Sequence, residues 1–221
     1  MSKPVPAPSV LSPLTAVLRR FLPDYLRLVE PDTAEHLRLD RLAILDLPPA
    51  APPLHGVVAE ALTRKDETVT VLALVEPEPL SPAGTAKLFG GWLELLELRY
   101  CRPVLLSVLY LQGGRPSLNL ETTWVAKVAG LDVVRLYFTA FGLSGARAAY
   151  YLDRPQPIAW ALAALMGYHG SSEELRERCK TRIATAEAPL LEDGDRDLLA
   201  RLVDAVGQDS DQDSEGLSHE S

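Results

Sequence analysis

The pattern of apolar and polar positions predicts a chain that starts with helix, continues with strands and ends with helices. Apolar residues recur at steps of three and four over 15–28, which predicts a helix that Pro23 kinks or splits. A second short helix is expected to start near Pro31. Short apolar runs bounded by charge or proline predict strands at 42–47, 55–62, 69–75, 103–111 and 133–140, with 124–128 as a partner of the last.

The run VTVLALV at 69–75 is the clearest strand, and its unbroken apolar character predicts burial on both faces. Ser81 and Pro82 are a good N-cap and first residue for a helix over 82–99. A helix that crosses between two strands implies a parallel pair within a mixed sheet. We therefore predict an α/β fold of the order αβββαβ, in which 82–99 covers one face of the sheet.

The last third of the chain is predicted to be helical. Helices are expected at 155–166, 173–186 and 195–206, and Gly207 is expected to end the last one. Ser171 or Ser172 caps the middle helix, with Glu174 placed as in a capping box. We predict one domain over 14–206, a disordered Pro-rich lead-in over 1–13 and a disordered acidic tail over 207–221.

Charge and cysteine content narrow the class of protein. The 221 residues hold 30 acids and 22 bases, and five of the acids lie in 208–221, so the rest is weakly acidic rather than a strongly basic nucleic-acid module. The two cysteines have no CxxC partner, which excludes a disulfide scaffold and a cysteine metal site. The N-terminal stretch lacks a secretory h-region and no apolar run approaches a membrane span, so we expect a cytoplasmic protein with no membrane partner.

Two carboxylates follow the buried strand directly. On an extended chain Glu76 and Glu78 point the same way, about 6.6 Å apart. Such a pair could hold Mg²⁺, which prefers oxygen ligands, and the alternative is a solvated acidic strand end before a proline-rich turn. The four histidines form no HxH or HExxH motif, and neither a GxSxG elbow nor Walker spacing occurs.

The order of these segments resembles the PD-(D/E)XK nuclease core and, more narrowly, the bacterial Rpn family of recombination-promoting nucleases, which are also called transposase-like. The likeness covers residues 16–206. It rests on four stretches, FLPDYLRLVEPDTAEHLRLDRLAILDL, VTVLALVEPE, RPVLLSVLYLQGG and QPIAWALAALM. The resemblance implies a restriction-endonuclease-like core and Mg²⁺-dependent hydrolysis of DNA, with the metal held by an Asp on one strand and a Glu on the next.

Carried over by position, the resemblance assigns metal binding to Glu76 and Asp46 and catalytic roles to Glu76 and Glu78. Glu78 stands where a Gln or Lys is expected. Gly56 stands where the Asp is expected, and it offers no ligand. Glu60 shares its side of the strand but lies about 13 Å further along.

The departures at 56 and 78 favour a degenerate site with weak or no metal-dependent DNA cleavage. The alternatives are an active Mg²⁺-dependent DNA endonuclease, a non-enzymatic protein of the same fold that binds a partner or nucleic acid, and a structural homodimer. An ion bound against Glu76 would separate them.

Overall fold

The computed structural model describes residues 8–46, 55–79, 84, 103–113, 121–128, 131–186 and 191–215, with only the backbone described for 8–9, 121–128, 131–137 and 208–215. The helices are α1 (Pro8–Arg20), α2 (Leu22–Val29), α3 (Pro31–His36), the 3₁₀ turn η1 (Leu39–Arg41), α5 (Ala148–Leu152), α6 (Pro157–Ala163), α7 (Ser172–Ala184) and α8 (Asp193–Glu215). The strands are β1 (Ala43–Leu45), β2 (Gly56–Leu62), β3 (Thr68–Glu76), β4 (Val104–Tyr110), β5 (Glu121–Val128) and β6 (Leu131–Gly142).

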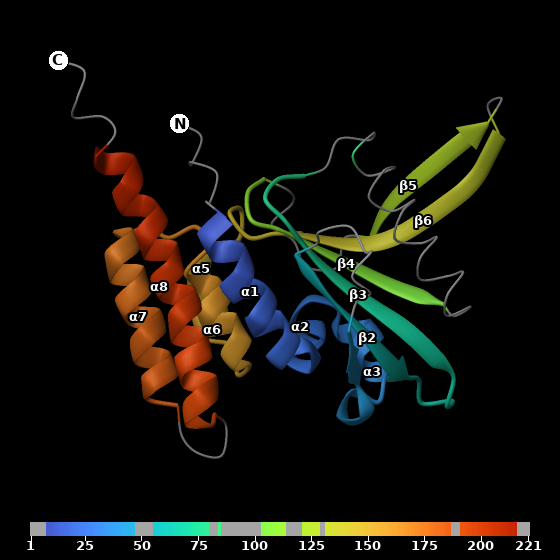
Figure 1. Cartoon of the computed structure of the whole chain (residues 1–221), viewed down its shortest axis with the longest axis horizontal. Helices are drawn as coiled ribbons and strands as arrows, with labels where there is room; N and C mark the ends of the chain where they lie inside the picture. The colour runs from blue at the N-terminus through green and yellow to red at the C-terminus, as the bar shows by residue number, and fades with distance from the viewer. Residues whose placement is uncertain are drawn as a thin grey trace.

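The six strands form one mixed sheet in the order β1-β2-β3-β4-β6-β5 (Figure 1). The pairs β1–β2, β2–β3 and β5–β6 are antiparallel, whereas β3–β4 and β4–β6 are parallel. The α/β class, the mixed sheet and the interior position of 69–76 are thus confirmed. The predicted helix over 82–99 lies outside the described residues except for Gly84.

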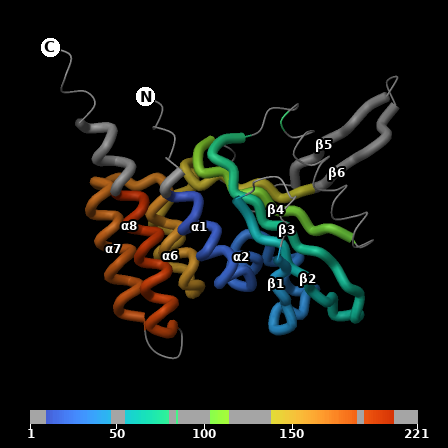
Figure 2. Tube along the Cα trace, in the orientation of Figure 1, coloured from blue at the N-terminus to red at the C-terminus, as the bar shows by residue number. Residues whose placement is uncertain are grey.

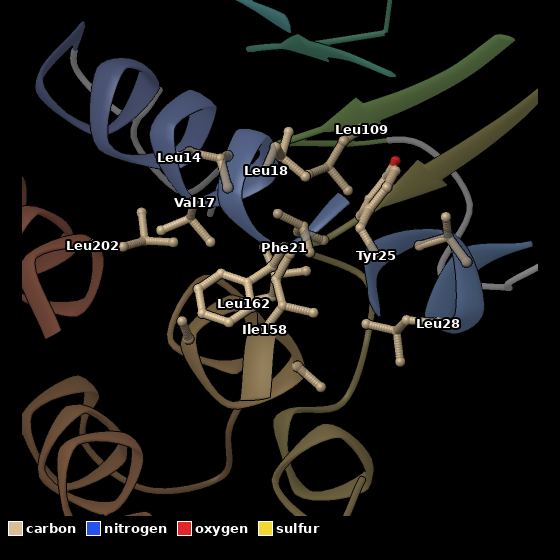
Figure 3. Close-up of a cluster of buried hydrophobic side chains, with 14 of the residues drawn as sticks. Leu14, Val17, Leu18, Phe21, Tyr25, Leu28, Leu109, Ile158, Leu162 and Leu202 are labelled. Carbon is tan, nitrogen blue, oxygen red and sulfur yellow. The ribbon is translucent and has the colours of Figure 1, made fainter. Parts of the chain in front are cut away.

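The first two helices cover one face of this sheet. Alternate residues of the strands, such as Val71, Ala73 and Val75, belong to the same apolar core as Leu14 and Leu18 of α1. Figure 3 shows this cluster between α1, α2, α6 and the strands, with side chains from all of them pointing toward one another. The core therefore joins the start of the chain to its middle and its last third.

The C-terminal helices pack outside α1. Helix α8 contacts α1 and α7, and α6 contacts α2, α7 and α8. Figure 2 shows α7 and α8 on the side of α1 and α6 that faces away from the sheet. The helix boundaries follow local signals: Ser171 caps α7 through its Oγ, which accepts from the Glu174 N–H.

The helix predicted over 15–28 is split near Pro23, which is one of the two predicted outcomes. Helix α1 ends at Arg20 and α2 begins at Leu22, which puts Pro23 in the first turn of α2. A proline is tolerated there because the first N–H groups of a helix have no intrahelical partner.

Both terminal helices extend beyond their predicted ends. Helix α1 begins at Pro8, inside the predicted lead-in, because Val10 and Leu11 continue its apolar stripe and are buried. Helix α8 runs to Glu215, which corrects the predicted end at Gly207. Glycine costs a helix about 1 kcal/mol relative to alanine, and that cost alone does not stop a helix whose preceding turns are packed. The short helix α5 was not predicted.

Candidate carboxylate site at the sheet edge

Glu76 is the last residue of β3, where that strand pairs with the end of β4. It lies opposite Tyr110, and its backbone carbonyl accepts from the Leu111 N–H at 3.0 Å. The side chain is half-buried, and this burial raises the pKa of the Glu76 carboxyl. The shift is caused by burial, which removes solvent from the charged form.

The loops that follow the parallel strands meet at the edge that holds Glu76. The Gln112 N–H donates to the Pro77 carbonyl at 2.8 Å, and the Gly113 N–H donates to Ser144 Oγ at 3.0 Å. Gly113 has a φ of 64° and lies against the ring of Pro79. In open α/β sheets, ligands bind outside the carboxyl ends of parallel strands, and this edge is such a place.

Glu78 lies beyond the strand. The chain bends at 77–78, and the Glu78 side chain is exposed. Because the strand ends at Glu76, the two carboxylates do not lie on one extended strand, although the sequence predicted that they would. Strand geometry therefore does not make them point in the same direction.

Asp46 follows β1 and is not brought to Glu76. Its neighbour Leu45 pairs with Val58, and Val58 pairs with Leu72 of β3. At ordinary strand spacings, the backbone of Asp46 is roughly 14 Å from that of Glu76. Its exposed carboxylate accepts from Arg19 Nη2 at 2.7 Å, which gives Asp46 a partner on α1 instead.

Gly56, the position that corresponds to the expected Asp, lies against the backbone of β3. It pairs with Leu74 and shares a sheet face with Glu76. A Cβ placed on Gly56 would lie 2.6 Å from the Ala73 carbonyl oxygen and 2.9 Å from Leu74 Cδ2. Any side chain at 56 therefore requires a shift of β2 relative to β3, a packing constraint that the sequence did not reveal.

The donor set at this edge does not fit a metal held by two strand carboxylates. Glu60 pairs with Thr70, six positions before Glu76, and so lies far down the sheet. Among the residues that the structure describes, no three His, Cys, Asp or Glu side chains are grouped so that they could hold a metal ion. Glu76 is thus the one carboxylate of the expected set that lies on the strand end.

Sequence reasoning missed a buried polar cluster on the opposite face of the sheet. Glu30, between α2 and α3, is 9% exposed, and burial raises the pKa of its carboxyl. Hydrogen bonds from the hydroxyl groups of Thr33, Thr139 and Ser107 oppose that shift. Ser107 pairs with Ala73, and Ala73 and Glu76 lie three positions apart on β3, on opposite faces of the sheet. The cluster therefore cannot form one site with Glu76. The serine inside the apolar run at 103–111 was the available signal.

In comparisons with known proteins, the chain matches no protein-family model, no curated protein and no solved structure. None of the helices in the described part of the chain is long and apolar enough to cross a membrane.

Proposed function

We propose that this chain is a PD-(D/E)XK nuclease-like protein, similar to the Rpn family, whose metal site is incomplete and whose Mg²⁺-dependent DNA cleavage is weak or absent. The observation that carries the proposal is the packing of Gly56 against the β3 backbone. The position that should supply the second metal ligand has neither a carboxylate nor room for one.

The connectivity of the strands supports the nuclease-like part of the proposal. The antiparallel meander β1–β2–β3 is followed by a parallel β4, which matches the strand order that the resemblance implies, and β5, β6 and the C-terminal helices come after it. The likeness in fold does not by itself imply activity, because function depends on the site.

The chemistry of Glu76 supports the weak-activity part. A divalent metal would activate water and offset charge on the phosphate, and it needs one or two well-placed carboxylates to be held. Among the described residues, Glu76 is the one carboxylate of the expected set at this strand end, and burial raises the pKa of its carboxyl because the charged form loses solvation. Glu78 adds a negative charge where a Lys or Gln would attract the phosphate. A few kcal/mol of lost transition-state stabilisation lowers the rate by orders of magnitude.

The same observations favour, as a second candidate, a non-enzymatic binding protein of this fold. Asp46 forms an ion pair with Arg19 and so links the end of β1 to α1. This carboxylate therefore has a structural role instead of a metal-binding one.

The test is cleavage of supercoiled and linear DNA in Mg²⁺ and in Mn²⁺ by the full chain, beside Glu76→Gln and the control Glu173→Gln, which changes an exposed carboxylate on α7. We expect equal and very low cleavage by all three proteins, and no Mn²⁺ binding by calorimetry. Robust cleavage that Glu76→Gln abolishes and Glu173→Gln retains would overturn the proposal.

A Gly56→Asp substitution would restore the expected carboxylate only if the β2 backbone moves away from Ala73. Its expected result is therefore a less stable protein without gained activity, and not the rescue that the sequence alone would predict. A stable, metal-binding and active Gly56→Asp protein would show that β2 adapts and that the carboxylate was the only defect.

A further inference from the structure

A pocket of about 560 Å³ opens beside the carboxyl end of β6. Its walls come from the segment 144–150, which follows β6 and enters α5, and from residues 167–169 after α6. Through the hydrogen bond from the Gly113 N–H to Ser144 Oγ, the pocket adjoins the loop that follows β4. It lies at the edge where the parallel strands end, the place where open α/β sheets generally bind ligands, and its lining does not include Glu76.

The backbone of the pocket is held in place. The Ala148 N–H donates to the Gly167 carbonyl at 2.9 Å, and the Gly167 N–H donates to the Ala146 carbonyl at 2.8 Å. These two bonds form a parallel bridge between Arg147 and Gly167. A site on a backbone fixed in this way loses little conformational entropy when it binds a ligand.

One aromatic wall is also fixed. The Tyr168 hydroxyl donates to Glu174 Oε1 at 2.9 Å and accepts from Arg178 Nη1 at 2.7 Å. The Arg178 guanidinium lies 5.6 Å from the centre of the Tyr168 ring. The hydroxyl of Tyr168 is thus hydrogen-bonded and its ring contacts Arg178, so Tyr168 forms a fixed wall of the pocket.

Tyr150 has the opposite character. It is 65% exposed, and it is the only large hydrophobic side chain that is exposed among the residues whose side chains the structure describes. Arg147 is the N-cap of α5, and Tyr150 is the third residue of that helix. Both residues are exposed and both line the pocket, so it offers a ligand one aromatic ring and one guanidinium.

The charge of the pocket differs from that of the chain. The whole sequence carries a net charge of −8, yet none of the described residues that line this pocket is an Asp or a Glu. Its ionisable lining consists of Arg147, His169 and the two tyrosines, and neither Arg147 nor His169 forms an ion pair with a described residue. The pocket thus fits a ligand that is flat, apolar on its faces and negatively charged at one end.

We infer that this pocket binds one nucleotide of a single-stranded nucleic acid, with the base stacked on Tyr150 and the adjoining phosphate paired with Arg147. Tyrosine rings stack on bases of any sequence, and the guanidinium fork matches phosphate oxygens. His169 also lines the pocket, and an imidazole N–H can donate a hydrogen bond to a phosphate oxygen. One stack and one ion pair hold a free nucleotide weakly, and a longer strand offers further nucleotides for contacts outside the pocket. The inference does not depend on Glu76.

The test is fluorescence anisotropy of a labelled 12-nucleotide single strand titrated with the full chain at low salt, in the presence of EDTA. Tyr150→Ala should weaken binding at least about fivefold, because each base stack contributes about 1–3 kcal/mol, whereas Tyr150→Phe keeps the ring and should bind as the native chain does. Arg147→Gln should weaken binding and reduce its dependence on salt. The charge control Arg201→Gln, on α8, should change neither.

Several outcomes would overturn the inference. These are native affinity in Tyr150→Ala, equal losses in Arg147→Gln and Arg201→Gln, or displacement of the strand by micromolar AMP, which would assign the pocket to a free nucleotide. Native binding by Glu76→Gln would support the inference, and loss of binding there would overturn the independence of the two sites. Because Tyr150 is exposed, its variants should keep the native melting temperature, which confirms that they are folded.

Discussion

The hydroxyl groups of Tyr25 and Ser107 lie 2.9 Å apart in the protein interior, although the two residues are 82 positions apart in the chain. The contact ties α2 to the centre of β4, and Figure 3 shows the Tyr25 hydroxyl directed toward the strands. Ser107 also hydrogen-bonds to the buried Glu30 carboxyl. Ser107 is thus shared between two polar groups that apolar side chains surround.

Removal of the Ser107 hydroxyl should therefore cost more than removal of the Tyr25 hydroxyl. Tyr25→Phe leaves Ser107 bonded to Glu30 and should lower the free energy of unfolding by about 1 kcal/mol. Ser107→Ala leaves both Tyr25 and Glu30 short of a partner and should cost about 2–3 kcal/mol. Urea unfolding measures both values, with the exposed Tyr150→Phe as a control expected to change nothing. A Ser107→Ala protein as stable as Tyr25→Phe would contradict the shared bond.

Stability should fall as the pH rises from the ordinary Glu pKa of 4.5 to the raised pKa of folded Glu30. In that interval the folded state binds more protons at Glu30 than the unfolded state does, so raising the pH favours unfolding. Glu30→Gln should flatten this part of the profile. Burial also raises the pKa of Glu76, so its ionisation lowers stability in the same direction as the pH rises. Glu76→Gln should therefore remove a second, independent part of the pH dependence. Chemical unfolding between pH 4 and 8 tests this, and an unchanged slope in Glu30→Gln would refute the assignment.

Gly56→Ala should destabilise the protein, whereas Gly194→Ala should not. A Cβ at 56 meets the Ala73 carbonyl oxygen at 2.6 Å, so the β2–β3 pair must separate, and such overpacking costs about 1–3 kcal/mol. A Cβ at 194 meets nothing within 4 Å, and alanine favours the first turn of α8. Thermal melting of the two variants compares them directly. Equal melting temperatures would mean that β2 yields without cost.

The ion pair between Arg20 and Asp195 should stabilise the contact between α1 and α8. Arg20 Nε and Nη2 donate to the two oxygens of Asp195 at 2.6 and 3.1 Å, and these bonds hold the pKa of the Asp195 carboxyl below its ordinary value of 3.8. Because the folded pKa is lowered, the pair contributes stability above pH 3.8, and this contribution is lost as the pH falls through the lowered pKa.

Arg20→Met should therefore cost about 0.5–1 kcal/mol at pH 7, because the arginine is half-exposed and solvent screens the pair. Arg19→Met is the matched control, since its partner Asp46 is 90% exposed, and it should cost less. Urea unfolding at pH 7 and pH 3 checks both variants. A larger loss in Arg19→Met would contradict this ranking.

Local patterns along the chain were enough to predict most of the elements. The apolar run at 69–75, the proline at 23 and the serine cap at 171 depend on neighbours within a few residues, and all three appear in the structure as expected. The outer ends of α1 and α8 were not predicted: α1 starts earlier, where Val10 and Leu11 are buried, and α8 continues past Gly207 to Glu215. The carboxylate site could be predicted only as residue types, with Glu76 at a strand end.

Strand register and the contacts between distant segments decided the rest. Register separates Asp46 from Glu76, and the close approach of β3 explains Gly56 as a packing requirement as well as a missing ligand. The Glu30 cluster joins residues from α2, α3, β4 and β6, which no local pattern connects. Periodicity and caps act over one or two turns of chain, whereas a site or a buried hydrogen bond forms only when segments tens of residues apart take one particular register.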